Sequence, residues 1–223
     1  MAAEKMREQA YHSFTQHLLA SDVRPGQFVS QRELMALTGM PLAAIRELVP
    51  RLEAEGLITT IPQRGMQIAP IDFNLVRDAY EFRVILETAA VTHFTQTASD
   101  HEIQKIRDTH EEILRRAELG EASAEFDAYA QTVDWGFHDL LIDSMRNEII
   151  GKAYRVNSLK IRLIRQELTR IDGHVVPVMK EHLPIILAIQ ARDTNAAVAE
   201  LVSHIGTARQ RALGMDNRTA AGP

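Results

Sequence analysis

From about residue 72 to residue 213, apolar side chains recur at helical spacing, and no stretch shows the alternation of a strand. Turn residues divide this part of the chain into expected helices at roughly 72–95, 99–119, 122–144, 147–171, 176–192 and 194–213. Amphipathic helices joined by short turns bury their apolar faces best against one another. This part of the sequence therefore predicts an antiparallel all-α bundle of about six helices, whose interior can hold a ligand or a metal ion.

The first 70 residues predict shorter helices. Apolar residues from Tyr11 to Leu19 recur at helical spacing. Ser30 and Glu33 form the expected capping box of a second short helix, which ends at Gly39. After a tight turn, a third helix is expected over about 41–55. Many proteins contain such a helix-turn-helix order, and only some of them bind DNA.

A hairpin is expected after the third helix. The β-prone runs at 57–61 and 66–68 flank Pro62-Gln63-Arg64-Gly65, which gives the hairpin a basic tip. Helix, helix-turn-helix and hairpin together predict a winged helix-turn-helix. The sequence therefore predicts a mainly α protein with a winged helix-turn-helix domain over 1–70, an all-helical domain over 71–215, and a disordered tail over 216–223.

Composition and charge exclude several kinds of protein. The chain has no cysteine, so a metal ion would need His and carboxylate ligands. No apolar run approaches the ~18 residues that span a bilayer, and the N-terminus lacks the apolar block of a signal peptide, so we expect a soluble, cytoplasmic protein without membrane contacts. Residues 1–70 carry seven Lys and Arg and seven Asp and Glu, and the whole chain has a net charge of −5. DNA binding would therefore depend on individually placed arginines.

Two spacings point to a metal site in the bundle. Asp134 and His138 lie four residues apart on one predicted helix, so both project from the same face. His182 lies eleven residues before Asp193, at the turn between the last two helices, and His204 lies eleven residues after it. At a rise of ~1.5 Å per residue, both imidazoles lie ~16 Å from the turn and can meet across an antiparallel pair. An Asp-x-x-x-His pair alone is more often an ion pair or a core histidine, but the combined spacings favour a site with three imidazoles and one carboxylate.

Such a ligand set suits zinc first, and nickel, manganese, iron and cobalt are also compatible with it. Arg83 lies on the inward face of the first bundle helix, four residues before Glu87. Its guanidinium either pairs with Glu87 or binds the carboxylate of a small effector beside the metal, and both can hold together. The remaining histidines show no comparable spacing and are interpreted as surface or boundary residues; they are His12, His17, His93, His101, His110 and His174.

Short motifs from about residue 7 to residue 213 share one pattern. The N-terminal motifs are Arg24-Pro25-Gly26, Ser30-Gln31-Arg32-Glu33-Leu34, Ile45-Arg46-Glu47, Arg51-Leu52-Glu53-Ala54-Glu55-Gly56-Leu57 and Pro62-Gln63-Arg64-Gly65. The C-terminal motifs are Glu81-Phe82-Arg83-Val84-Ile85-Leu86-Glu87, Asp134 with Phe137-His138, Glu181-His182, and Asp193 with Ala197 and His204. Together they resemble the GntR family of bacterial transcriptional regulators, in the subgroup with a FadR-type effector (FCD) domain and its VanR-like branch.

The resemblance implies a homodimer that binds a palindromic DNA operator and responds to a small carboxylate effector next to a metal ion. It implies metal ligands at Asp134, His138, His182 and His204. It places Arg83 and Asn147 in the effector pocket. The residues that it implies for DNA contacts are Arg32, Arg46, Gln63, Arg64 and Gly65.

The alternative function is a metal-dependent, hydrolase-like enzyme, in which an open site with three His and one Asp activates water. The sequence offers no evident separate general base for such an enzyme, and the winged module would have no role in it. We therefore expect a transcription regulator without catalytic residues.

Overall fold

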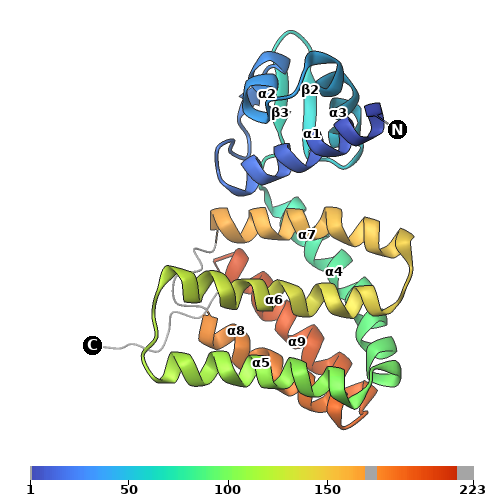
Figure 1. Cartoon of the computed structure of the whole chain (residues 1–223), viewed down its shortest axis with the longest axis vertical. Helices are drawn as coiled ribbons and strands as arrows, with labels where there is room; N and C mark the ends of the chain where they lie inside the picture. The colour runs from blue at the N-terminus through green and yellow to red at the C-terminus, as the bar shows by residue number, and fades with distance from the viewer. Residues whose placement is uncertain (1, 169–174, 215–223) are drawn as a thin grey trace.

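The computed structural model describes residues 2–168 and 175–214 (Figure 1). The predicted tail over 216–223 and the predicted surface residue His174 lie outside the described residues. The N-terminal elements are α1 (Ala2–Leu19), β1 (Phe28–Val29), α2 (Gln31–Thr38), α3 (Leu42–Ala54), β2 (Ile58–Ile61) and β3 (Gly65–Ile68). The helices that follow are α4 (Phe73–Thr97), α5 (Asp100–Glu118), α6 (Ala124–Ser144), α7 (Glu148–Leu168), α8 (Val175–Gln190) and α9 (Thr194–Ala212).

The N-terminal elements form a winged helix-turn-helix, which we call the head. Ser30 and Glu33 make the predicted capping box at the start of α2, and Gly39 ends that helix in the left-handed conformation. β2 and β3 form the predicted antiparallel hairpin, and β1 adds a third strand in the order β1-β3-β2. β1 was not predicted, because two residues are too few to show an alternating pattern.

The helices α4 to α9 form the predicted bundle, and their described ends lie within a few residues of the predicted ones. α4 is the central helix and contacts α6, α7, α8 and α9, while α5 packs on α8. Their apolar faces share one buried cluster that includes Tyr80, Phe94, Leu141 and Ile185. None of the described helices combines the length and the hydropathy needed to cross a membrane. The fold class predicted from the sequence is therefore confirmed.

α7 lies between the head and the rest of the bundle (Figure 1). Leu159 and Leu163 on one face of α7 belong to the hydrophobic cluster of the head. Tyr154 and Ile161 on another face belong to the cluster of the bundle. Because the same helix contributes to both cores, a shift of α7 must disturb packing on both sides.

Candidate metal centre and DNA-binding surface

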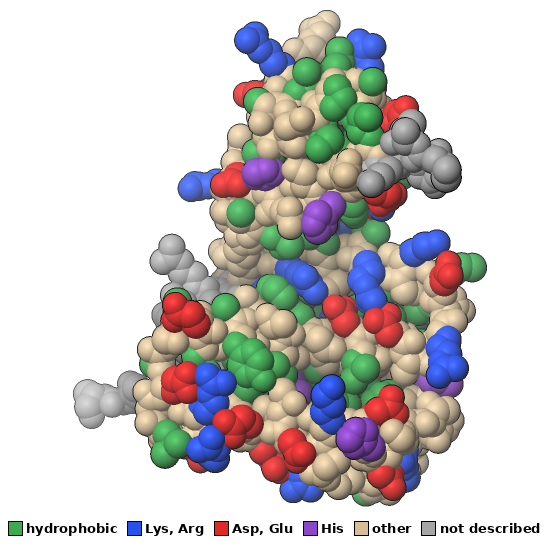
Figure 2. Space-filling model, viewed as in Figure 1, with side chains coloured by type: hydrophobic (Ala, Val, Ile, Leu, Met, Phe, Trp, Pro, Cys, Tyr) green, Lys and Arg blue, Asp and Glu red, His purple; other side chains and the backbone are tan. Residues whose placement is uncertain are grey.

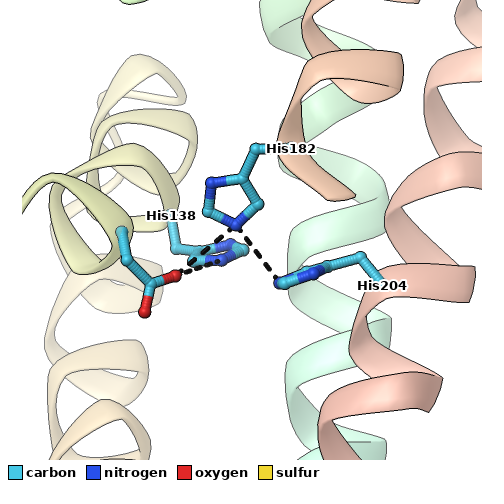
Figure 3. Close-up of side chains that lie close together, drawn as sticks. His138, His182 and His204 are labelled. Atoms are coloured by element: carbon cyan, nitrogen blue, oxygen red, sulfur yellow. Dashed lines mark hydrogen bonds and ion pairs between the residues drawn. The ribbon is translucent and has the colours of Figure 1, made fainter. Parts of the chain in front are cut away.

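Four side chains from three helices meet inside the bundle. Asp134 and His138 come from α6, His182 from α8 and His204 from α9, and their imidazole nitrogens and carboxylate oxygen lie within 4.8 Å of one another (Figure 3). All four residues are buried, with exposed fractions of 2%, 3%, 0% and 4% in that order. We call these residues the His/Asp cluster.

The spacing within the His/Asp cluster fits a common metal ion. His182 Nε2 lies 3.3 Å from His204 Nε2 and 3.5 Å from Asp134 Oδ1, and His138 Nε2 lies 3.8 Å from the same oxygen. Tetrahedral ligands that bind zinc at about 2.1 Å lie roughly 3.4 Å apart. Asp134 Oδ1 is buried and has no hydrogen-bond partner among the described residues. A buried carboxylate oxygen without a donor is costly, and a cation at this point would satisfy it.

Two carboxylates outside the cluster accept hydrogen bonds from the Nδ1 atoms of two of its imidazoles. His138 Nδ1 donates to Glu87 at 2.7 Å, and His204 Nδ1 donates to Glu181 at 2.9 Å. A carboxylate only accepts, so each of these neutral rings carries its proton on Nδ1 and its lone pair on Nε2. Nε2 therefore has the lone pair that binding a metal ion requires. A carboxylate that accepts the Nδ1 proton is typical of histidines that bind metals.

Burial keeps these imidazoles neutral near pH 7. It lowers the pKa of His138 and His182, and it lowers the pKa of His204 to about 4. For Asp134, burial alone would raise the pKa, but the neighbouring groups, the Arg165 guanidinium first among them, together hold the pKa below its usual value. The cluster therefore offers three neutral nitrogen donors and one carboxylate, the protonation states that metal binding requires.

Two arginines contact residues of the His/Asp cluster. Arg83 is buried, donates to Glu87 at 2.6 Å and also donates to His138 Nε2 at 2.6 Å. Arg165 on α7 donates to Asp134 Oδ2 at 2.5 Å. These two guanidiniums line a small cavity of about 10 Å³ together with Trp135, His138, Tyr154, Asn157, Ser158, Ile161 and Arg162. Arg162 Nε and Trp135 Nε1 are buried and have no hydrogen-bond partner in the part of the chain that the structure describes.

Sequence reasoning missed Arg162 and Arg165, because no motif marks them. The only signal is their position three residues apart, on the helix that also carries Asn157 and Ile161. The structure places Asn147, which the resemblance assigns to the effector pocket, away from this cavity. Its exposed side chain caps the start of α7, where it accepts from the backbone of Ile149 and Ile150 at 3.0 Å and 3.2 Å, and it does not line the cavity.

His110 also differs from its interpretation as a surface or boundary residue. It is only 1% exposed, and its Nε2 lies 3.1 Å from His182 Nδ1. The sequence hid this contact because the partner is 72 positions away on a different helix. The other histidines with a described environment, His12, His17, His93 and His101, are exposed or partly exposed.

The predicted DNA contacts lie on the surface of the head. Arg32 on α2 and Arg46 on α3 are exposed, and neither forms an ion pair with any described residue. In the hairpin turn, Gln63 and Arg64 are exposed, and the Arg64 guanidinium lies 4.6 Å from the centre of the Phe28 ring. Figure 2 shows basic side chains at the end of the head that points away from the bundle.

The turn of the wing depends on Gly65. Its φ is +93°, and a Cβ at this position would lie 3.0 Å from the carbonyl oxygen of Val29. A larger residue would therefore be strained and would press against β1. Gly65 fixes the shape of the wing beside Arg64 and brings only its backbone to the surface.

Comparisons with known proteins cover both parts of the chain. The family model "Bacterial regulatory proteins, gntR family" matches residues 6–68, and the model "FCD domain" matches residues 78–207. The Nta operon transcriptional regulator of Aminobacter aminovorans is 32% identical over 183 residues, which are 82% of each chain. The HTH-type transcriptional repressor RspR of Escherichia coli (strain K12) is 22% identical over 91% of this chain and 86% of its own length.

Solved structures have the same fold. Escherichia coli McbR/YncC matches with a TM-score of 0.73 and 13% identity over 95% of this chain and 99% of its own. A GntR transcriptional regulator from Rhodococcus sp. RHA1 matches with a TM-score of 0.73 and 20% identity over 95% of this chain and 98% of its own. The metal-free FCD domain of TM0439 matches 66% of this chain and 97% of its own, with a TM-score of 0.55 and 21% identity.

The domains and relatives are those of transcription regulators, which excludes the alternative of an enzyme. With a winged head matched over 6–68 and a helical domain matched over 78–207, the chain belongs to the GntR family of bacterial transcriptional regulators and carries an FCD domain.

Proposed function

We propose that this regulator binds its DNA operator under the control of a small organic anion, which sits beside a divalent transition metal in the FCD domain. The buried His/Asp cluster carries the proposal, because its Nε2 atoms and a carboxylate oxygen without a donor point to one place. Asp134, His138, His182 and His204 would hold the ion, with zinc as the first candidate. The bound ion would supply positive charge that attracts a carboxylate.

Charge balance favours an anion as the effector. Arg83 pairs with Glu87 and Arg165 pairs with Asp134, so these buried charges cancel while the histidines are neutral. A divalent ion adds two positive charges, and uncompensated charge in a buried site costs several kcal/mol. A small carboxylate would restore the balance, and Arg162 Nε and Trp135 Nε1 are donors without a partner among the described residues.

Arg83 has a defined part in this proposal. Its Nη2 and a metal ion both need the lone pair of His138 Nε2. When His138 Nε2 binds a metal ion, the Arg83 guanidinium keeps its hydrogen bond to Glu87, and its Nη2 is free to donate to the carboxylate of an effector. We infer that metal and effector therefore bind together, since each makes a better site for the other.

α7 would carry the signal to the head. The cavity is too small for an organic anion, so Arg162 and Arg165 have to move when one enters. Both belong to α7, whose Leu159 and Leu163 pack in the head. Within a homodimer on a palindromic operator, a shift of α7 would change the spacing of the two heads and hence the affinity for DNA. In this proposal, residues 1–70 bind DNA, and the helical domain from residue 71 binds the effector.

The DNA-binding part can be tested with duplexes that the wild-type protein selects from a random library. Arg46→Gln removes an exposed cation of α3 and should weaken binding to the selected duplex. The slope of log affinity against log salt should fall by about 1 if Arg46 contacts a phosphate. Arg77→Gln, on the exposed face of α4, is the matched control and should bind as the wild type does. Equal affinity of Arg46→Gln and wild type would contradict the assignment.

The effector part can be tested on the same selected duplex. Zinc with a panel of small mono-, di- and tricarboxylates should change the affinity of the wild-type protein for DNA. Asp134→Ala removes a cluster ligand and should abolish that response, whereas Asp127→Asn, near the start of the same helix, should keep it. If zinc and every acid leave the affinity of the wild type unchanged, effector control is excluded for this panel and the proposal fails.

A further inference from the structure

His182 is the one cluster histidine whose Nδ1 faces another imidazole, that of His110 on α5, within the described part of the chain. We propose that His110 is a positioning residue, which sets the tautomer and the orientation of His182 so that His182 Nε2 can bind the metal. This inference rests on the proposed function, because it assigns a further residue to the same site. It adds a residue that lies outside the set of four ligands.

The hydrogen bonds of His110 determine which nitrogen of His110 and of His182 carries the proton. His110 Nδ1 lies 2.8 Å from the carbonyl oxygen of Ile106, and a carbonyl only accepts. A neutral His110 therefore carries its proton on Nδ1 and keeps a lone pair on Nε2. This lone pair faces His182 Nδ1 at 3.1 Å, so His182 must donate from Nδ1. The lone pair of His182 is then on Nε2, 3.5 Å from Asp134 Oδ1 and 3.3 Å from His204 Nε2.

His182 depends on this contact more than the other two ligands depend on theirs. Glu87 and Glu181 are carboxylates and bind the Nδ1 protons of His138 and His204 with their charge. His182 is fully buried, and its partner is a neutral ring. In its neutral form each of the two rings carries one proton. Without His110, the Nδ1–H of His182 would be buried without an acceptor.

Packing keeps the two rings in place. Phe137 lies against both, with ring centres 5.5 Å from His110 and 4.8 Å from His182. On its other side, His110 borders a cavity of about 380 Å³ between α5 and α6, which Ile106, Val133, Gly136, Phe137 and Leu140 also line. This space allows residue 110 to be changed without pressing on the cluster.

The experiment compares His110→Gln, whose amide oxygen can take the place of Nε2 as an acceptor, with His110→Phe, which keeps a ring and lacks the acceptor. Zinc affinity is measured by competition with a chelator. We expect a loss of about 10- to 100-fold for His110→Phe and a change of only a few-fold for His110→Gln. His93→Phe is the matched control, since His93 bonds the carbonyl of Ser144 away from the cluster, and it should bind zinc as the wild type does.

A second readout is the nitrogen NMR spectrum of the histidine rings in the metal-free protein. His182 should carry its proton on Nδ1 in the wild type and in His110→Gln, and should shift toward the Nε2–H tautomer in His110→Phe. If His110→Phe does not fold, His110→Leu takes its place, and thermal unfolding verifies the fold of each variant.

The outcomes separate the two proposals. Wild-type zinc affinity in a folded His110→Phe, or an unchanged His182 tautomer, would overturn the role of His110. A wild-type protein that binds no zinc would contradict the metal site instead, and the tautomer spectra of the metal-free protein would still decide the role of His110.

Discussion

At the scale of single residues, burial and the neighbouring groups together decide the protonation state of each cluster side chain. Burial lowers the pKa of His204 from 6.5 to about 4, although the Glu181 carboxylate acts in the opposite direction. The groups around Asp134, Arg165 first among them, hold its pKa below the usual value in spite of its burial. Glu181 and Arg165 lie on other helices, so the spacing in the sequence could predict that the four side chains meet, but it could predict neither their protonation states nor Arg165.

The depressed pKa of His204 predicts how the metal-free protein responds to acid. Between pH 6.5 and pH 4 the unfolded chain binds the proton and the folded chain does not, so stability falls as the pH is lowered through this window. At about 1.4 kcal/mol per pH unit, the loss from this group is about 3 kcal/mol. Urea unfolding in the presence of a chelator should show it. His204→Gln should flatten the dependence, and His12→Gln, at an exposed position, should leave it unchanged.

Arg165→Gln tests the charge balance around Asp134. The substitution leaves a buried carboxylate without its cation and should lower the free energy of unfolding by about 3 kcal/mol. Zinc should stabilise this variant more than it stabilises the wild type, because the ion replaces the lost positive charge. Arg155→Gln breaks surface ion pairs to Asp139 and Asp143 and should cost less than about 1 kcal/mol. An equal effect of zinc on Arg165→Gln and on the wild type would count against the assignment of Asp134.

At the scale of elements, long periodic helices were predictable and short or shared elements were not. The capping box of α2 and the apolar stripes of the bundle helices are local signals, and they located these helices. β1 forms only because β3 is beside it, which is a tertiary effect. The sequence could not predict that α7 contributes to two cores. The spacing of its apolar residues predicts a helix but does not show which residues pack in the head and which in the bundle.

The double role of α7 makes Leu163 a test of the coupling. Leu163→Ala removes apolar contacts between α7 and the head and should cost about 2–3 kcal/mol of stability. The change in DNA affinity caused by zinc and carboxylate should shrink, while zinc affinity should stay the same, because Leu163 packs in the head and not around the His/Asp cluster. Leu187→Ala, at an exposed position of α8, should alter neither quantity. A full response in Leu163→Ala would show that the signal takes another route.

At the scale of the whole molecule, a chain with a net charge of −5 has exposed arginines in the head, where we propose that DNA binds. The head contributes exposed arginines without ion pairs among the described residues, and the acidic excess lies in the rest of the chain, which carries 18 Lys and Arg against 23 Asp and Glu. Net charge therefore gave little information on function. The order of the elements and the placement of single arginines gave more, and the family matches agree with them.

The proposed regulation depends on one cation held by four side chains, and the metal content of the protein tests this most directly. Wild-type protein and Asp134→Ala are equilibrated by dialysis with the same low zinc concentration, and the bound zinc is determined by elemental analysis. We predict one zinc ion per wild-type chain and a large loss of bound zinc in a folded Asp134→Ala. Wild-type protein without bound zinc, or Asp134→Ala with an unchanged zinc content, would contradict the account.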